Sequence, residues 1–180
     1  SHFRGFAQEL GVPHTTVAGY YEILEDCLIA ERIEPLSESR TRKKLTKSPR
    51  YLFFDLGVRR AAAEEGARLP VRVLGALFEQ FVGLELLRAS RSAGAPLHLR
   101  FWRDPDGPEV DWVLVSEDRW LPVEVKWSEA PSARDAAHLV TFLAEYPKAK
   151  EGFVICRTPT PFKLAPKVTA VSWQEIPTLV

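Results

Sequence analysis

The sequence contains no methionine, only two cysteines and no excess of charge of either sign. Lysine and arginine together number 24, as do aspartate and glutamate, so any case for nucleic acid must rest on local patches. Cys27 and Cys156 lack metal-ligand spacing, and we expect both to be small buried hydrophobic side chains in a cytoplasmic protein. Without methionine the chain is expected to be a piece of a longer protein, which leaves open whether Ser1 and His2 are native.

Long apolar runs are also missing. No stretch reaches the roughly 18 apolar residues that a membrane-spanning helix needs, and no signal-peptide pattern opens the chain, so we expect no membrane partner and no secretion. What is present is ordinary globular composition, with 46% apolar and 11% aromatic residues. At about 150 residues per domain, a length of 180 residues predicts one domain with a small appendage.

The N-terminal third predicts two short helices followed by a hairpin. Residues 3 to 36 show helical periodicity that is broken at Gly11, and extended runs lie at 27 to 33 and 51 to 54. Helices followed by a hairpin are the element order of a winged helix-turn-helix. We therefore expect such a unit over residues 1–56.

After a connector at 57–72, the pattern becomes that of an α/β domain at 73–180. A strongly apolar helix of about five turns comes first. An antiparallel meander, an amphipathic helix, a parallel strand and an edge strand are predicted after it, at 97–102, 110–115, 121–126, 132–145, 152–157 and 167–173. The predicted fold class is thus α/β, with a mixed sheet of about five strands behind a small winged helix-turn-helix.

The polar gap inside the predicted hairpin is strongly basic. Residues 37 to 50 hold six basic residues against one acid, and the candidates for contact with nucleic-acid phosphates are Arg40, Arg42, Lys43 and Lys44. A solvated loop is the open alternative. The second helix, His14 to Asp26, carries acids but no lysine or arginine, so we expect it to link or dock proteins rather than read bases.

Charged side chains interrupt two of the predicted strands. Glu124 and Lys126 point to one face of their strand because side chains alternate. Asp111, in the preceding strand, lies between Val110 and Trp112, which both prefer the buried side, so Asp111 can face the same side as Glu124. Burying such charges is costly, which indicates either a structural ion-pair cluster or a functional site.

This pattern resembles the PD-(D/E)xK nuclease superfamily, which has an acid in one strand, Glu-x-Lys in the next strand and a glutamate in a preceding helix. Its αβββαβ core matches the element order of residues 73 to 157, and Glu79 would be the helix acid. Val110 stands where the motif has proline before Asp111. Four stretches resemble a narrower group, the uncharacterised domain that follows the ATPase module in many prokaryotic AAA-type ATPases. In these proteins a winged helix joins the ATPase module to the domain. The four stretches are Gly75 to Val82, Trp102-Arg103, Glu109 to Val113 and Pro122 to Lys126.

This resemblance implies a metal-dependent reaction. Asp111 and Glu124, with Glu79 and the Val125 carbonyl, would be oxygen ligands of Mg²⁺, which would activate a water and neutralise a phosphodiester. Lys126, beside two carboxylates, is expected to stay protonated and to orient the water or steady the phosphate. The predicted catalytic residues are therefore Glu79, Asp111, Glu124 and Lys126.

The implied partners are DNA and the N-terminal ATPase part of the same protein, and the oligomeric state is left open. No Gly-x-x-x-x-Gly-Lys-Ser/Thr motif occurs, so we expect no nucleotide site in these residues. A second reading remains open, in which the domain cleaves nothing and is an interaction module that positions or regulates the ATPase.

Overall fold

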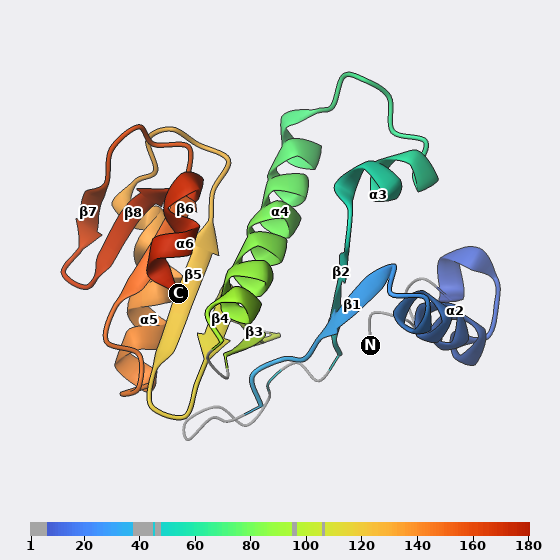
Figure 1. The fold of residues 1–180 in the computed structure, drawn as a ribbon, viewed down its shortest axis with the longest axis horizontal. Coiled ribbons are helices and arrows are strands. Elements are labelled where there is room, and N and C mark those ends of the chain that lie inside the picture. The colour runs from blue at the N-terminus through green and yellow to red at the C-terminus, as the bar shows by residue number, and fades with distance from the viewer. Residues whose placement is uncertain (1–6, 38–44, 46–47, 95–96, 106) are drawn as a thin grey trace.

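The computed structural model describes residues 7–37, 45, 48–94, 97–105 and 107–180. Its N-terminal part comprises a helical segment at 7–10, α2 (His14–Asp26), a hairpin of β1 (Ala30–Ile33) and β2 (Arg50–Phe53), and α3 (Leu56–Ala62), as Figure 1 shows. The helix break falls at Gly11, whose φ of +65° favours glycine. Helix, helix and hairpin follow in the predicted order, and their assignment as a winged helix-turn-helix stays a prediction.

Two helices then lead into the α/β part. The side chain of Asp55 accepts a hydrogen bond from the Val58 N–H and so caps α3. The long helix α4 (Val71–Ser92) begins directly after Pro70, a residue that suits a helix start. It is about one turn longer than the sequence suggested.

A six-stranded mixed sheet forms the centre of the α/β part. The meander is confirmed: β3 (His98–Arg103), β4 (Glu109–Val115) and β5 (Trp120–Val125) pair antiparallel. The crossover is also confirmed, because β5 and β6 (Gly152–Cys156) pair parallel. The strand order is β3-β4-β5-β6-β8-β7.

The far edge of the sheet differs from the prediction. A further strand, β7 (Phe162–Ala165), forms this edge and pairs antiparallel with β8 (Val168–Ser172). The strand expected at the edge, β8, instead lies inside the sheet. Pro161 and Pro166 flank β7 and gave it the appearance of a loop, but an edge strand tolerates proline because its outer side needs no ladder.

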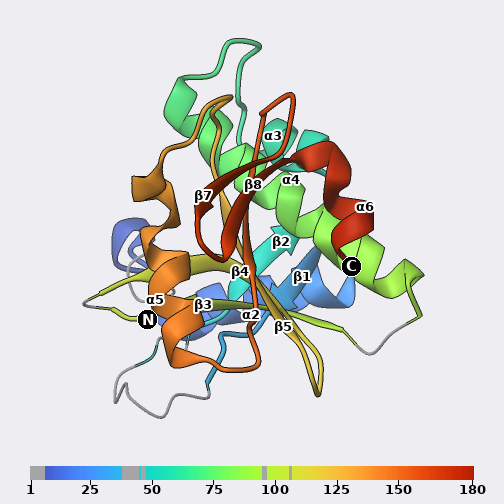
Figure 2. The same cartoon turned by 90° about the vertical axis from the view of Figure 1, so that its left-hand side faces the viewer.

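Helices cover both faces of the sheet (Figures 1 and 2). On one face lie α4 and α6 (Ile176–Leu179), and on the other lie the 3₁₀ turn η1 (Ala133–Ala136) and α5 (Ala137–Glu145). Two separate hydrophobic clusters result, one on each side of the sheet. The central strands β4, β5 and β6 are therefore buried on both faces, and a charged side chain in them needs a specific partner.

The N-terminal hairpin shares the core on the α4 side. Ile33 and Leu52 belong to the same buried cluster as Trp112. A Cβ at Gly83 of α4 would lie 2.7 Å from the Trp112 ring and 3.2 Å from Leu52, so glycine permits this close approach. The predicted boundaries at 56 and 72 divide the sequence, whereas the core continues across them.

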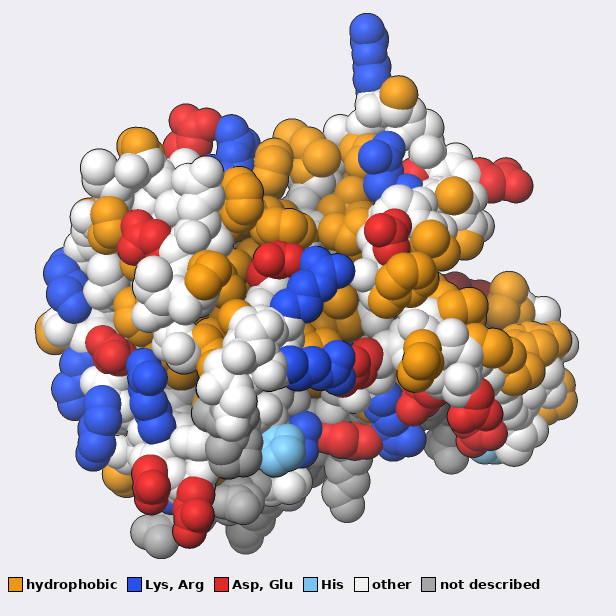
Figure 3. All heavy atoms as spheres, in the orientation of Figure 1, with side chains coloured by type: hydrophobic (Ala, Val, Ile, Leu, Met, Phe, Trp, Pro, Cys, Tyr) orange, Lys and Arg blue, Asp and Glu red, His pale blue; other side chains and the backbone are white. Residues whose placement is uncertain are grey.

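Several large hydrophobic side chains remain at the surface. Those on the N-terminal part are Leu10, Tyr20, Ile23, Leu28, Phe54 and Val58. Cys27 is also exposed, so the expectation that it is buried was wrong, whereas Cys156 is buried as expected. Figure 3 shows hydrophobic side chains gathered over the α2 region, on the right of the view. Across the residues that the structure covers, no helix combines the length and apolar character needed to cross a bilayer.

Candidate active site

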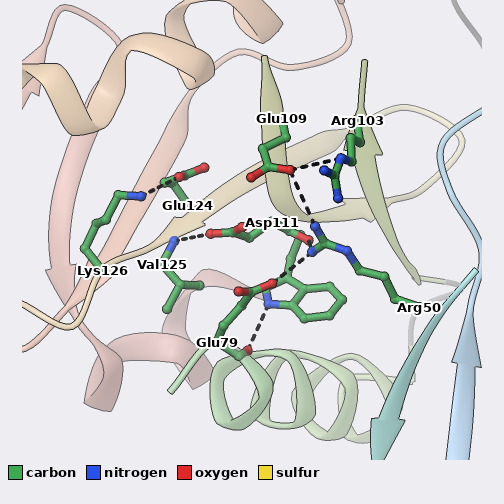
Figure 4. A network of polar contacts seen from close by, with 9 residues as sticks. Arg50, Glu79, Arg103, Glu109, Asp111, Glu124, Val125 and Lys126 are labelled. Atoms are coloured by element: carbon green, nitrogen blue, oxygen red, sulfur yellow. Dashed lines mark hydrogen bonds and ion pairs between the residues drawn. The ribbon is translucent and has the colours of Figure 1, made fainter. Parts of the chain in front are cut away.

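The structure brings the four predicted catalytic residues into one polar network (Figure 4). Glu79 comes from α4, Asp111 from β4 and Glu124 from β5, with Lys126 just after that strand. Lys126 Nζ lies 2.7 Å from Glu124 Oε1. Asp111 and Glu124 are buried, with only 8% and 4% of their surface exposed. These carboxylates are therefore removed from bulk water, and their charges depend on their neighbours.

A β-bulge places Asp111. Arg100 pairs with Val113 and Trp102 pairs with Val110, which leaves two residues of β4, Asp111 and Trp112, opposite one residue of β3. Such a bulge redirects side chains. The expectation that Val110 and Trp112 share one face was wrong, because Val110 joins the α5-side cluster and Trp112 the α4-side cluster.

Hydrogen bonds fix the orientation of Asp111. Its Oδ2 accepts a bond of 2.9 Å from the Val125 N–H. The indole N–H of the neighbouring Trp112 donates to the Glu79 carbonyl at 3.1 Å. Neighbouring residues of β4 are thereby tied both to β5 and to α4, so the site's three elements are held in one arrangement.

Arg50 is a member of the site that the sequence analysis missed. Its Nη1 donates to Glu79 Oε1 at 2.9 Å and to the Asp111 carbonyl at 3.1 Å. Its guanidinium carbon lies 4.6 Å from the centre of the Phe101 ring. The sequence analysis counted Arg50 in the basic loop, but it begins β2 and reaches across to α4 and β4 (Figure 4). The apolar run that follows it signals a strand, but no pattern in the sequence signals this distant partner.

Two more charged residues, Arg103 and Glu109, belong to the polar network. Glu109 Oε2 lies 3.4 Å from Arg103 Nε and 3.9 Å from Arg50 Nη2. Both residues occur in the short motifs on which the resemblance rests, but neither was predicted to be a site residue. The predicted phosphate-binding residues Arg40, Arg42, Lys43 and Lys44 lie outside the described residues.

Burial disfavours the ionised form of all three predicted carboxylates. It raises the pKa of Glu124 to about 8, and the charge of Asp111 adds to this effect. Burial and Asp111 likewise raise the pKa of Glu79 to about 7, although Arg50 opposes them. The pKa of Asp111 is also raised, chiefly by burial. At neutral pH burial therefore favours the protonated form of Glu124, and a bound cation would have to displace that proton.

Lys126 behaves as the sequence predicted. Burial lowers its pKa, but the carboxylates of Glu124 and Asp111 outweigh burial and hold it above the ordinary value of 10.5. Lys126 is therefore a cation at neutral pH, which suits an electrostatic role better than that of a general base.

The donor set fits a hard divalent cation such as Mg²⁺. Glu124 Oε2 is buried and has no hydrogen-bond partner, so it is an oxygen available for a ligand. In the part of the chain that the structure describes, no group of three or more His, Cys, Asp or Glu side chains lies close enough together to hold a metal ion. Mg²⁺ does not require such a group, because it is commonly held by one or two carboxylates and keeps several waters.

Comparison with known protein families finds two matches to this chain. Residues 74–176, more than half of the chain, match the family described as "Domain of unknown function (DUF4143)". The chain belongs to this family. Since DUF4143 domains are found after AAA ATPase modules, the broader resemblance to an ATPase-associated domain is confirmed. Residues 2–69 match a second family, "Domain of unknown function (DUF8612)".

Other comparisons add little. No match was found among curated proteins. One similar solved structure is a chain of a half-complex from a tetradecameric assembly of Thermococcus gammatolerans McrB AAA+ hexamers with bound McrC. The sequences are 18% identical, the TM-score is 0.41, and the match covers 54% of this chain and 27% of that one. This chain therefore spans about a quarter of that neighbour's length.

Proposed function

We propose that this DUF4143 domain is a nuclease of the PD-(D/E)xK type, with a restriction-endonuclease-like core, that hydrolyses DNA phosphodiesters with Mg²⁺ beside an AAA-type ATPase. The observation that carries the proposal is the pairing of two buried carboxylates, Asp111 and Glu124, with Lys126 and with an unsatisfied Glu124 oxygen. Perturbed carboxylates beside a fixed cation are typical of catalytic sites.

Each residue has a distinct task in this proposal. Asp111 and Glu124 would hold the cation, which when bound lowers the pKa of a water and offsets charge on the phosphodiester. Lys126, held protonated, would orient the attacking water or steady the phosphate. The basic residues Arg40, Arg42, Lys43 and Lys44 would contact phosphates along the DNA.

Metal titration and cleavage assays test the proposal together. Titration calorimetry with Mn²⁺ and Mg²⁺ should detect binding by the wild type that is lost in Asp111→Asn and Glu124→Gln. The wild type should nick plasmid or branched DNA, and Lys126→Met should bind metal but cleave at least 100-fold more slowly. Glu117→Gln, in the exposed turn between β4 and β5, is the matched control and should behave as wild type.

A second candidate function is a non-catalytic module that docks the ATPase or another protein. It is favoured by the exposed apolar side chains of the N-terminal part, of which Leu28 is 82% exposed. Two acids of α2, Glu22 and Asp26, are also exposed and would repel DNA. Absence of metal binding and cleavage, together with a complex with the ATPase part that Ile23→Asp disrupts, would select this alternative.

A further inference from the structure

The polar network consists of two groups of contacts that meet at Asp111. In the first, Arg50 binds Glu79, Glu109 and the backbone carbonyl of Asp111. The second comprises the Asp111 carboxylate, bonded to the Val125 N–H, and the ion pair of Glu124 with Lys126 (Figure 4). The guanidinium of Arg50 thus pairs with the Glu79 carboxylate of α4. In the contacts described, the side chains of Asp111 and Glu124 accept no hydrogen bond from Arg50.

The fold itself holds Arg50 in place. Arg50 pairs with Ile33 across the hairpin, and Leu52, two residues along the same strand, is 1% exposed in the shared core. The guanidinium carbon also lies 4.6 Å and 5.6 Å from the centres of the Phe101 and Trp112 rings. The hairpin thus fixes the backbone of Arg50, and the two rings and Glu79 hold its side chain in the site.

Charge balance indicates how many cations this network accepts. Its members are four carboxylates, from Glu79, Glu109, Asp111 and Glu124, and three cations, from Arg50, Arg103 and Lys126. With all seven groups ionised the network carries one excess negative charge, so one divalent ion leaves a net charge of +1, whereas two would leave +3 around the buried Asp111 and Glu124. A cation beside Glu79 would also lie against the guanidinium and be repelled.

We propose that Arg50 is a positioning residue that acts as the permanent counter-ion of Glu79, so that the site takes a single divalent cation, held by Asp111 and Glu124 without Glu79. The part of this inference that concerns the metal rests on the proposed function. Arg50 thereby sets the metal stoichiometry from outside the α/β part of the chain.

Counting bound Mn²⁺ tests the stoichiometry. Calorimetry and electron paramagnetic resonance should find one Mn²⁺ in the wild type and a second in Arg50→Met. Arg50→Lys, which retains the charge, should return the count to one. Arg103→Met is the matched control, because Arg103 pairs with Glu109 and makes no described contact with Glu79, and its count should stay at one. Glu79→Gln should keep the wild-type affinity within threefold.

Two results would overturn the inference: two equivalents of Mn²⁺ in the wild type, or a loss of tenfold or more in affinity in Glu79→Gln. A metal-free measurement separates it from the proposed function. In urea unfolding with chelator at pH 8.5, Arg50→Met should lower the midpoint, and Glu79→Gln added to it should restore part of the loss. If the wild type binds no metal but this coupling is present, the nuclease proposal fails and the counter-ion role stands; without coupling, the counter-ion role fails.

Discussion

The carboxylate of Asp111 accepts a hydrogen bond of 2.9 Å from the backbone N–H of Val125, the residue between Glu124 and Lys126. This bond joins the metal-binding candidate of β4 directly to the Glu-x-Lys segment of β5. Asp111 therefore has a structural task in addition to its proposed chemical one, and the two can be separated by choice of substitution.

Asp111→Ala and Asp111→Asn should differ in stability although both remove the charge. Alanine leaves the buried Val125 N–H without an acceptor, which costs about 1–3 kcal/mol, whereas asparagine keeps a side-chain oxygen in place. We expect alanine to be the less stable variant by about that amount in metal-free urea unfolding. Equal stabilities would contradict the assigned bond.

The free energy of unfolding should decrease as pH rises from about 4.5 to about 8. The pKa of Glu124, about 8, and that of Glu79, about 7, lie above the ordinary 4.5, so the native state binds more protons than the unfolded state across this window. The stabilisation is complete below pH 4.5 and is lost through the folded pKa values. Thermal unfolding in chelator from pH 4.5 to 9 measures this slope, which Glu124→Gln should flatten and exposed Glu117→Gln should leave unchanged.

Added Mg²⁺ should stabilise the protein more at pH 8.5 than at pH 5.5. A cation binds the deprotonated carboxylates, so metal and protons compete for Asp111 and Glu124. At 100 times the dissociation constant, the gain is about 2.7 kcal/mol. Differential scanning fluorimetry at the two pH values checks this, and equal shifts at both, or a shift that persists in Glu124→Gln, would argue against binding at this site.

Charge reversal in the basic loop should weaken DNA binding. With Arg42, Lys43 and Lys44 changed to glutamate, affinity for non-specific duplex should fall at least tenfold at low salt, and the dependence of affinity on salt should become less steep, because fewer counterions are released. Filter binding across a salt series measures both quantities.

A matched control reverses three basic residues elsewhere. Arg119, Lys148 and Lys150 are exposed and lie in other turns, and their reversal changes the net charge by the same amount. The control should lose less affinity than the loop variant. Equal losses would mean that overall charge, and not the loop, governs binding.

The sequence predicted the elements whose pattern is local. The meander and the crossover were predicted from short, mainly apolar runs separated by turn residues, and the structure reproduces them within one or two residues. Strand β7 was not predicted because proline on both sides is typical of a loop. The prolines are compatible with a strand here because β7 lies at the edge of the sheet.

The sequence predicted Glu79, Asp111, Glu124 and Lys126 as site residues, but it predicted neither the geometry of the site nor the presence of Glu109 in it. Glu124 lies in β5 and Lys126 follows directly after its end, two residues along, so the alternation of extended backbone predicts their pairing. Asp111 depends on a bulge, which no single-strand pattern reveals. Arg50 could not be assigned because, within a basic run, an arginine that solvent surrounds and one that aromatic rings enclose look identical.

The contact between Leu52 of the hairpin and Gly83 of α4 has a consequence for how the two segments of the chain can be exchanged. The two family matches follow one another along the chain, but side chains from both belong to the same hydrophobic core. A gene fusion that exchanged the first segment for an unrelated one would expose the hydrophobic side chains of α4 that the hairpin covers. It would also remove Arg50, whose guanidinium binds Glu79. We therefore expect recombination that separates the two segments to lower stability, and recombination that keeps them together to be tolerated.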